Sequence, residues 1–329
     1  MAKHATYAPF PVTANQAPHR VNYLSRALRT LASLLSTMAS GSEGPPRPQG
    51  ISVYMRVKDE KDWVEPAIRS VQGMADEIVV VDNGSVDGTW EVLRDMAGSG
   101  AGQIRLWQRP ELHHVDLSNF ALEKTCFRWV LRWDGDMVAH TDGPHPISEL
   151  RRRLLTLPPR RHYLIYLRHT NLAGDLGHQD PREQVHIEEY LHTFSPKARF
   201  IHPGRFEAVQ FPLYYRPLFW YEPYGFHVNI KPARRTLLRY FWEDWMERKD
   251  YVRYPTIEDY TAAHLAATFG TTDWEEAQQR CLARVLADFI PYDTTRFGPY
   301  PALLQPFLAK PSYRILYDNG RIVGREEGR

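Results

Sequence analysis

The spacing of hydrophobic residues changes from a helical pattern to short strand-like runs near residue 50. Apolar residues recur at helical spacing between Val21 and Met38, with arginines on the opposite side, which predicts an amphipathic helix. The next segment, SGSEGPPRPQG at 40–50, is dense in glycine, proline and serine and predicts a linker. The folded unit is therefore expected to begin at Ile51.

Short apolar runs and helical patterns alternate from Ile51 to Trp133. This alternation predicts an α/β fold with a mainly parallel central sheet and helices on both faces. Ligands of such sheets bind beyond the carboxyl ends of the strands, so polar residues directly after strands are the first candidates for a site. The expected strands are Ile51–Val57, Glu77–Val81, Ile104–Gln108 and Phe127–Trp133, with helices around Val64–Val71, after Gly88 and around Leu117–Thr125.

The later part of the chain has a mixed pattern. The segment 171–224 is rich in proline, histidine and aromatic residues and predicts irregular strands and loops, whereas Asn319-Gly320 between two β-rich runs predicts a hairpin. We therefore expect an N-terminal extension over 1–50, a sheet domain over 51–235 and a helical and hairpin extension over 236–329. Further expected elements are helices over Ile147–Leu157, Arg234–Lys249 and Trp274–Phe289 and a strand over Tyr163–Leu167.

Acidic residues follow three of the expected strands. Asp59 and Glu60 come after the first, Asp82 ends the second, and Asp134 and Asp136 follow the fourth. Two carboxylates separated by one residue can both approach a divalent cation, and oxygen ligands suit Mg²⁺ or Mn²⁺. Such a cation neutralises the negative charge of a diphosphate leaving group. The sequence therefore predicts a metal site at this edge of the sheet.

These segments resemble a known family. ISVYMRVKDE at 51–60 and EIVVVDNGSVDGT at 77–89 are similar to the opening of family 2 glycosyltransferases, which have the GT-A fold, and WDGDM at 133–137 resembles their DxD motif. The resemblance runs from about Ile51 to Met137. It departs from the family at Lys58, where relatives often have a small polar residue, and this leaves the identity of the bound base open.

The resemblance implies a role for each acidic residue. Asp59 and Glu60 would lie along the nucleotide pocket, and Asp82 would contact the base, commonly uracil. Asp134 would touch the ribose or bridge to the metal, and Asp136 would be the principal ligand of Mn²⁺ or Mg²⁺.

Relatives often carry a further metal or diphosphate ligand after the sheet, together with basic residues that close over the donor. The segment 225–235, GFHVNIKPARR, offers His227 as a third metal ligand. Lys231 and Arg234 are the candidates for contacts with the donor.

Transfer with inversion needs a carboxylate that deprotonates the acceptor hydroxyl. Glu207 resembles an acidic position on the acceptor side of several family 2 enzymes, and its neighbours in sequence are mostly apolar. It is therefore the first candidate for this general base. Glu188, Glu189 and Asp244 are the alternatives.

The composition limits which partners the protein is expected to bind and in which cellular compartment it is expected to work. Lys and Arg number 41 against 39 Asp and Glu, so a dedicated nucleic-acid binder is not expected. Cys126 and Cys281 form neither a disulfide framework nor a zinc motif, which fits the reducing cytoplasm. No long apolar stretch predicts a membrane span. Two interpretations of Val21–Met38 stay open: packing on the protein itself or a second subunit, and peripheral contact with a membrane.

The sequence thus predicts a metal-dependent glycosyltransferase that moves a sugar from a nucleoside diphosphate, with UDP-sugars favoured, to a hydroxyl acceptor that it does not name. The alternative is a catalytically inactive GT-A-like protein that binds carbohydrate or acts as a scaffold. A Rossmann dehydrogenase would need a glycine-rich turn after the first strand, and residues 57–62 contain no glycine.

Overall fold

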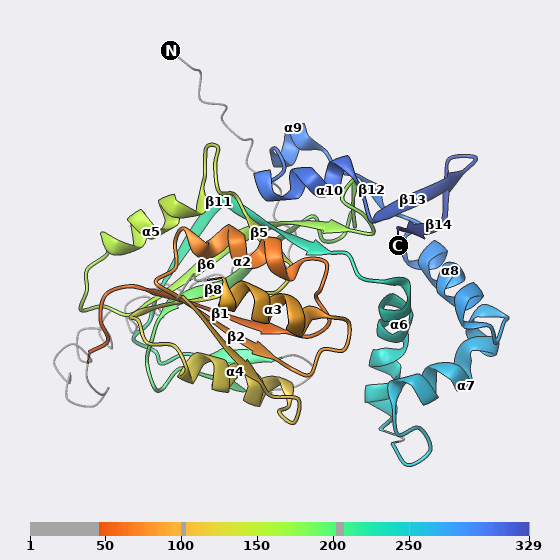
Figure 1. Ribbon diagram of the computed structural model, residues 1–329, viewed down its shortest axis with the longest axis horizontal. Helices are drawn as coiled ribbons and strands as arrows, with labels where there is room; N and C mark the ends of the chain where they lie inside the picture. The colour runs from red at the N-terminus through yellow and green to blue at the C-terminus, as the bar shows by residue number, and fades with distance from the viewer. Residues whose placement is uncertain (1–45, 100–102, 202–206, 250, 329) are drawn as a thin grey trace. The chain divides into compact units, whose positions relative to one another are not determined.

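The computed structural model describes residues 46–99, 103–201, 207–249 and 251–328 (Figure 1). The predicted helix over Val21–Met38 and most of the N-terminal extension lie outside these residues. The chain forms two compact units, which interleave along the sequence. Unit 1 runs to Thr170 and includes Val185–His227 and Thr294–Leu304, and unit 2 comprises Asn171–Gln184, Val228–Asp293 and Gln305–Arg329. The predicted domain boundaries near Ile51 and Arg235 stay a prediction.

A single sheet organises unit 1, with strands in the order β3-β2-β1-β4-β8-β6-β11-β5 (Figure 1). The strands β3, β2, β1 and β4 pair in parallel, and β8 then pairs antiparallel with both β4 and β6. This confirms the predicted α/β class. The strand bounds are β1 Ile51–Val57, β2 Glu77–Asp82, β3 Ile104–Gln108, β4 Trp129–Arg132, β5 Met137–Ala139, β6 Tyr163–Ala173, β8 Val185–Thr193 and β11 Arg216–Asn229.

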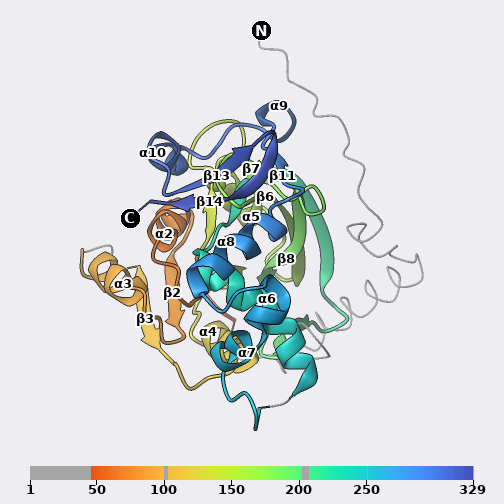
Figure 2. The same cartoon turned by 90° about the vertical axis from the view of Figure 1, so that its right-hand side faces the viewer.

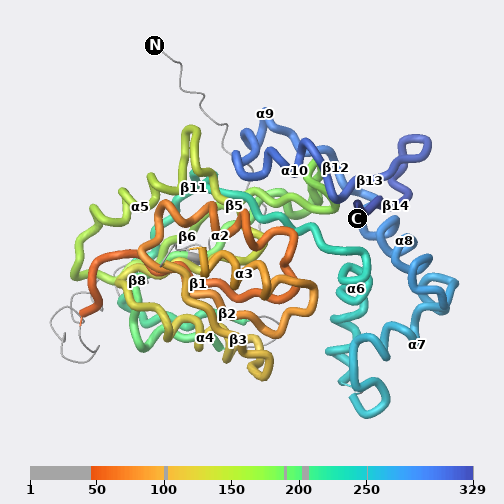
Figure 3. Tube along the Cα trace, viewed as in Figure 1, coloured from red at the N-terminus to blue at the C-terminus, as the bar shows by residue number. Residues whose placement is uncertain are grey.

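Helices cover both faces of the parallel strands because apolar residues point to both sides (Figures 2 and 3). Val53 and Met55 of β1 pack in one core with α2 (Val64–Gln72), α3 (Thr89–Gly98) and α5 (Ile147–Leu155). Tyr54 faces the other side, where it packs with α4 (His114–Glu123) and Phe200. The predicted helices on both faces are therefore confirmed.

The segment 171–224, predicted to contain irregular strands and loops, contains strand β8 and most of the long strand β11, which is more regular than expected. Pro217 and Pro223 obscure β11 in the sequence, since proline usually marks the end or the edge of a strand. The short strand β5 pairs only with Gly225–His227, so both prolines lie where β5 no longer runs beside β11. The same segment contains the short strands β7 His178–Gln179, β9 Arg199–Ile201 and β10 Ala208–Gln210.

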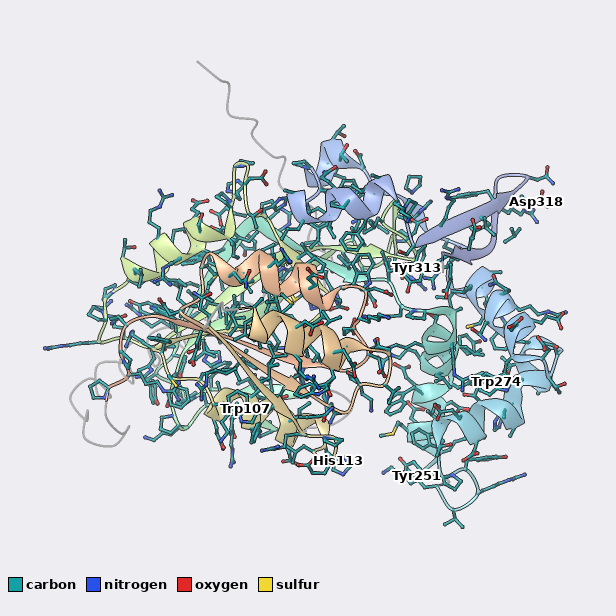
Figure 4. All side chains as sticks on the ribbon, in the orientation of Figure 1. Trp107, His113, Tyr251, Trp274, Tyr313 and Asp318 are labelled. Atoms are coloured by element: carbon teal, nitrogen blue, oxygen red, sulfur yellow. The ribbon has the colours of Figure 1, made fainter. Side chains whose placement is uncertain are left out.

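Unit 2 contains α6 (Ala233–Arg248), α7 (Ile257–Phe269) and α8 (Trp274–Val285). Of these, α6 and α8 lie close to the helices predicted over Arg234–Lys249 and Trp274–Phe289. Leu237, Phe241, Tyr260 and Cys281 belong to their shared core. Trp274 at the start of α8 is labelled in Figure 4. The remaining short elements of the chain are β12 Ile290–Pro291, α9 Thr294–Phe297, η1 Ala302–Leu304 and α10 Gln305–Ala309.

The predicted hairpin is present in unit 2 as β13 (Tyr313–Asp318) and β14 (Arg321–Glu327). Asp318 pairs with Arg321, so only two residues form the turn, and Asp318 lies at its tip (Figure 4). Asn319 and Gly320 have φ values of 47° and 77°, and two-residue hairpin turns favour such positive values. Among the helices that the structure describes, none combines the length and apolar character that a membrane span needs.

Candidate active site

The acidic residues singled out by the sequence gather along one edge of the sheet in unit 1. β1 has β2 on one side and β4 on the other, all parallel, so their carboxyl ends lie together. Asp59 and Glu60 follow β1, Asp82 ends β2, and Asp134 lies just after β4. This is the edge at which parallel sheets of this kind bind their ligands.

The loops after β1 and β2 are fastened to each other by hydrogen bonds. The backbone N–H of Asp59 donates to Ser85 Oγ at 2.9 Å, and Asp59 Oδ1 accepts from the N–H of Val86 at 2.8 Å. The backbone N–H of Glu60 donates to Thr89 Oγ1 at 2.8 Å. Asp59 has a φ of 55°, an unusual value for a residue other than glycine, and these contacts hold it there. The two loops therefore form one preorganised wall of the site.

Asp82 is fully buried and shapes the turn that follows it. Its Oδ2 accepts from the backbone N–H groups of Gly84 at 3.0 Å and Ser85 at 3.1 Å, and from Gln108 Nε2 at 3.1 Å. Its Oδ1 accepts from Ser85 Oγ. In this conformation the carboxylate of Asp82 stabilises the turn after β2 through these hydrogen bonds. Its predicted contact with a base stays a prediction.

Asp136 lies beside His227, although 91 residues separate them in sequence. Asp136 belongs to the turn between β4 and β5, and β11 pairs antiparallel with β5 so that His227 is opposite Met137. The distance from His227 Nε2 to Asp136 Oδ2 is 3.3 Å, and the two side chains are 29% and 8% exposed. Two neighbouring ligands about 2.1 Å from an octahedral metal ion are about 3.0 Å apart, so this spacing suits two ligands of one ion.

The donor set fits Mg²⁺ or Mn²⁺ held together with a phosphate. No cluster of three or more histidine, cysteine or acidic residues suited to a metal occurs among the residues described. A magnesium ion commonly takes only one or two carboxylates from the protein and completes its shell with substrate phosphates and water. Asp136 and His227 therefore supply a partial site of the kind that a nucleoside diphosphate would complete.

Asp134 is paired with Arg132, the last residue of β4. Arg132 Nε donates to Asp134 Oδ1 at 3.3 Å, and Arg132 Nη2 donates to Oδ2 at 3.2 Å. The Asp134 side chain keeps 24% of its surface exposed. Both of its oxygens thus face Arg132 in this conformation, and its predicted roles at the ribose and the metal stay predictions.

Two arginines surround the carboxylate of Glu207 in the fold, although its neighbours in sequence are mostly apolar. Arg56 Nη1 and Nη2 donate to its two oxygens at 2.8 and 2.6 Å. Ser118 Oγ donates to Oε2 at 3.1 Å, Arg132 Nη1 lies 3.4 Å from Oε1, and His114 Nε2 lies 3.6 Å from Oε2. Glu207 is therefore the centre of a polar cluster that joins β1, β4 and α4.

Arg56 and Arg132 were not predicted as site residues, although the sequence contains a signal for them. Both lie in strands that are otherwise mostly apolar, ISVYMRV and WVLR. A buried charge is retained only when it is paired, so a charge within a buried strand indicates a partner elsewhere in the fold. The identity of that partner cannot be read from the strand itself.

A cavity of about 90 Å³ lies beside this cluster in unit 1. Glu188, one alternative general base, lines it together with Glu207 and contacts His186. The side chain of Glu189 lies outside the described residues. Asp244 belongs to α6 of unit 2, where it accepts hydrogen bonds from Arg248 and Tyr260. The other residues lining the cavity are Tyr54, Arg132, His192, Phe200, Ala208 and Val209.

The predicted donor contacts Lys231 and Arg234 belong to unit 2. The backbone carbonyl of Lys231 accepts a hydrogen bond from Arg325, and the guanidinium of Arg234 lies 4.7 Å from the centre of the Trp274 ring. Their role at a donor phosphate stays a prediction.

The fold defines an α/β protein whose acidic residues lie at the carboxyl ends of parallel strands, as expected for the predicted GT-A class. Residues 52–147 match the model of glycosyl transferase family 2, which confirms the resemblance seen in the sequence. Over 86 residues the chain is 35% identical to uncharacterized glycosyltransferases of Rickettsia typhi and Rickettsia prowazekii, covering 26% of this chain. The matched segment spans 27% of the length of these curated relatives.

Two solved structures are also similar to this chain. TarS 1–349 of S. aureus matches with 11% identity and a TM-score of 0.39, covering 83% of this chain and 96% of that one. Glucosyl-3-phosphoglycerate synthase from Mycobacterium tuberculosis, in complex with Mn²⁺, UDP and phosphoglyceric acid, matches with 24% identity and a TM-score of 0.26. That match covers 44% of this chain and 47% of the synthase. TM-scores this low are no basis for assigning a ligand to this chain.

Proposed function

We propose that this protein is a metal-dependent glycosyltransferase that moves a sugar from a nucleoside diphosphate, with UDP-sugars favoured, to a hydroxyl acceptor. The proposal rests on one observation above all. Asp136, within the family 2 segment, lies 3.3 Å from His227 beside the edge where the parallel strands end. A carboxylate and an imidazole at this spacing can share a divalent cation, and a bound diphosphate would supply further ligands.

The residues of the site have distinct roles in this proposal. Asp136 and His227 hold Mn²⁺ or Mg²⁺, which supplies positive charge to the diphosphate as it leaves. The loops around Asp59, Glu60 and Asp82 form the wall against which the nucleotide binds. Lys231 and Arg234 remain proposed contacts for the donor phosphates.

We do not assign Glu207 as the general base, since both of its oxygens already accept hydrogen bonds from Arg56. Glu188, which lines the neighbouring cavity, stays a candidate. The acceptor is a hydroxyl compound that is not identified, and the proposed setting is the cytoplasm.

The test is hydrolysis of nucleotide sugars by the full-length protein without acceptor, with and without Mn²⁺. We expect Mn²⁺-dependent release of the nucleoside diphosphate from at least one UDP-sugar. A ligand present at about 100 times its Kd should also stabilise the fold by about 2.7 kcal/mol in a thermal unfolding assay. A carbohydrate-binding or scaffold protein would release no nucleotide, and stabilisation by sugars alone would favour that alternative.

The variant Asp136→Asn tests the metal site within this assay. It keeps the side-chain volume and removes the charge, so turnover should fall by about a hundredfold or more, as on loss of one strong electrostatic stabiliser. Excess Mn²⁺ should restore only part of it. The exposed Asp142 provides the matched control, because Asp142→Asn makes the same chemical change away from the site. Equal activities of the two variants at equal melting temperatures would remove Asp136 from the mechanism.

A further inference from the structure

Arg132 joins two carboxylates that the proposed mechanism treats separately. It is the last residue of β4, and its guanidinium donates to both oxygens of Asp134 at 3.2 and 3.3 Å. Its Nη1 lies 3.4 Å from Oε1 of Glu207. A guanidinium that bridges two carboxylates has less freedom to rotate than one in a single exposed pair.

Glu207 is itself fixed by rigid elements. Arg56 of β1 binds it through two parallel hydrogen bonds, and Ser118 of α4 donates a third. The side chains of Arg56 and Glu207 are 8% and 10% exposed. Paired arginine–carboxylate contacts of this geometry add orientation as well as energy.

Stability alone is a weak reason for such a buried pair. Desolvation of two charges offsets much of their attraction, and replacing a buried pair by apolar residues is often neutral or stabilising. In addition, the pair fixes the orientation of the Glu207 carboxylate and so of Arg132, which contacts it. Arg132 in turn orients the neighbouring carboxylate of Asp134, which is 24% exposed just after β4.

We propose that Arg132 and Glu207 are positioning residues, which hold the carboxylate of Asp134 in the orientation that receives the nucleotide sugar. Arg132 acts on Asp134 directly, and Glu207 acts by holding Arg132. This inference rests on the proposed function, since it requires that Asp134 contacts the donor. It gives Glu207 a role that differs from the general base expected from the sequence.

The inference makes a specific kinetic prediction. Arg132→Lys keeps the charge and removes the planar, two-pronged contact, so Asp134 should lose its orientation. The KM for the nucleotide sugar should rise about tenfold, which corresponds to about 1.4 kcal/mol of lost binding. The Kd for Mn²⁺ should change less than twofold, because in this proposal Asp134 contacts the nucleotide whereas Asp136 and His227 hold the metal. Glu207→Gln should show the same pattern with a kcat within threefold of the wild type.

A double variant tests whether the two residues act through one path. If Glu207 works only by holding Arg132, Glu207→Gln combined with Arg132→Lys should raise KM no further than Arg132→Lys alone. Arg151 provides the matched control. It binds Asp76 through two hydrogen bonds of 2.7 and 2.9 Å. Asp76 directly precedes β2, so this pair lies at the end of β2 opposite to Asp82. Arg151→Lys should therefore leave KM unchanged.

Each result supports or overturns the inference. An unchanged KM in Arg132→Lys and Glu207→Gln, with activity retained, would overturn the positioning role and leave the glycosyltransferase intact. A hundredfold loss of kcat in Glu207→Gln, with loss of the rise in rate at higher pH, would make Glu207 the general base. A wild-type protein that neither binds nor cleaves any nucleotide sugar would overturn the proposed function and this inference with it. If Glu207→Gln does not fold, Glu207→Asp serves in its place, and its melting temperature is measured beside the kinetics.

Discussion

The pair Asp136 and His227 depends on the register of two strands more than on local sequence. β11 pairs with β5 over Gly225–His227, and this pairing sets the imidazole opposite Met137, next to Asp136. A shift of one residue would turn His227 to the other face of the sheet, because strand side chains alternate. The geometry of the candidate metal site therefore depends on the register of this short antiparallel pairing.

We predict that His227→Gln lowers the affinity for Mn²⁺ at least tenfold while the fold persists, because an amide is a much poorer ligand than imidazole for this type of ion. The measurement is calorimetric titration of Mn²⁺ in the presence of UDP. His113 is the control, since it is exposed in unit 1 (Figure 4), and His113→Gln should bind the metal as the wild type does. Equal affinities of the two variants would exclude His227 from the site.

The sequence predicted which acidic residues reach the edge of the sheet but not the surroundings of Glu207. Asp59, Asp82 and Asp134 follow strands, so their placement depends on local patterns. Glu207 meets Arg56 across a separation of 151 residues, and nothing in the local sequence encodes that contact. Pairing of distant charges follows from the tertiary fold, which periodicity alone does not determine.

At the scale of secondary structure, the turn between β4 and β5 brings Asp134 and Asp136 close to the loop after β1. A Cβ atom at Gly135 would lie 2.9 Å from Val57 Cγ1 and 3.2 Å from Glu60 Cγ. Contacts below 3.0 Å require something to move, and Val57 is buried in the core. Gly135 therefore allows the two loops to approach each other closely.

We predict that Gly135→Ala destabilises the protein by about 1–3 kcal/mol, as overpacked sites do, and lowers turnover beyond the loss of stability. The matched substitution is Gly73→Ala at the end of α2, where φ is −68° and no atom lies within 4 Å of the added Cβ. That variant should be neutral or more stable by up to about 1 kcal/mol. Urea unfolding and donor hydrolysis of both variants provide the measurement, and indistinguishable stabilities would contradict the close approach at Gly135.

Element prediction from the sequence succeeded where one physical signal dominated. The parallel strands β1, β2 and β4 are buried on both faces and form short apolar runs, and the turn Asn319-Gly320 has the residues that positive φ angles favour. β11 was not predicted as a regular strand, because it contains Pro217 and Pro223 and mixes polar with aromatic residues. Its strand structure comes from pairing with β5 and β6, which no local propensity reveals.

At the scale of the whole molecule, unit 1 buries three histidines that are neutral in the folded state. Burial lowers the pKa of His140 to about 4, of His169 to about 3 and of His192 to about 4. His192 Nδ1 donates to the carbonyl of Thr193 at 3.0 Å, and the His169 ring lies edge-on to Trp133. To take up a proton on acidification, each imidazole would have to become charged while buried.

We predict that unit 1 loses stability as the pH falls from about 6.5 towards 4.5, because unfolded histidines have a pKa near 6.5 and bind protons that the folded ones reject. The stabilisation is complete above the unfolded pKa and decreases below it, by at most about 1.4 kcal/mol per pH unit for each histidine. Carboxylates with a lowered pKa, such as Asp76 and Glu77, contribute mainly below about pH 5, so the upper part of this window reports the histidines. Urea unfolding of the protein across this window measures the slope.

His192→Gln should reduce the slope whatever its effect on stability near pH 7, and His113→Gln at the exposed position should not. A free energy of unfolding that stays constant across the window would show that the three imidazoles are not held neutral by the fold.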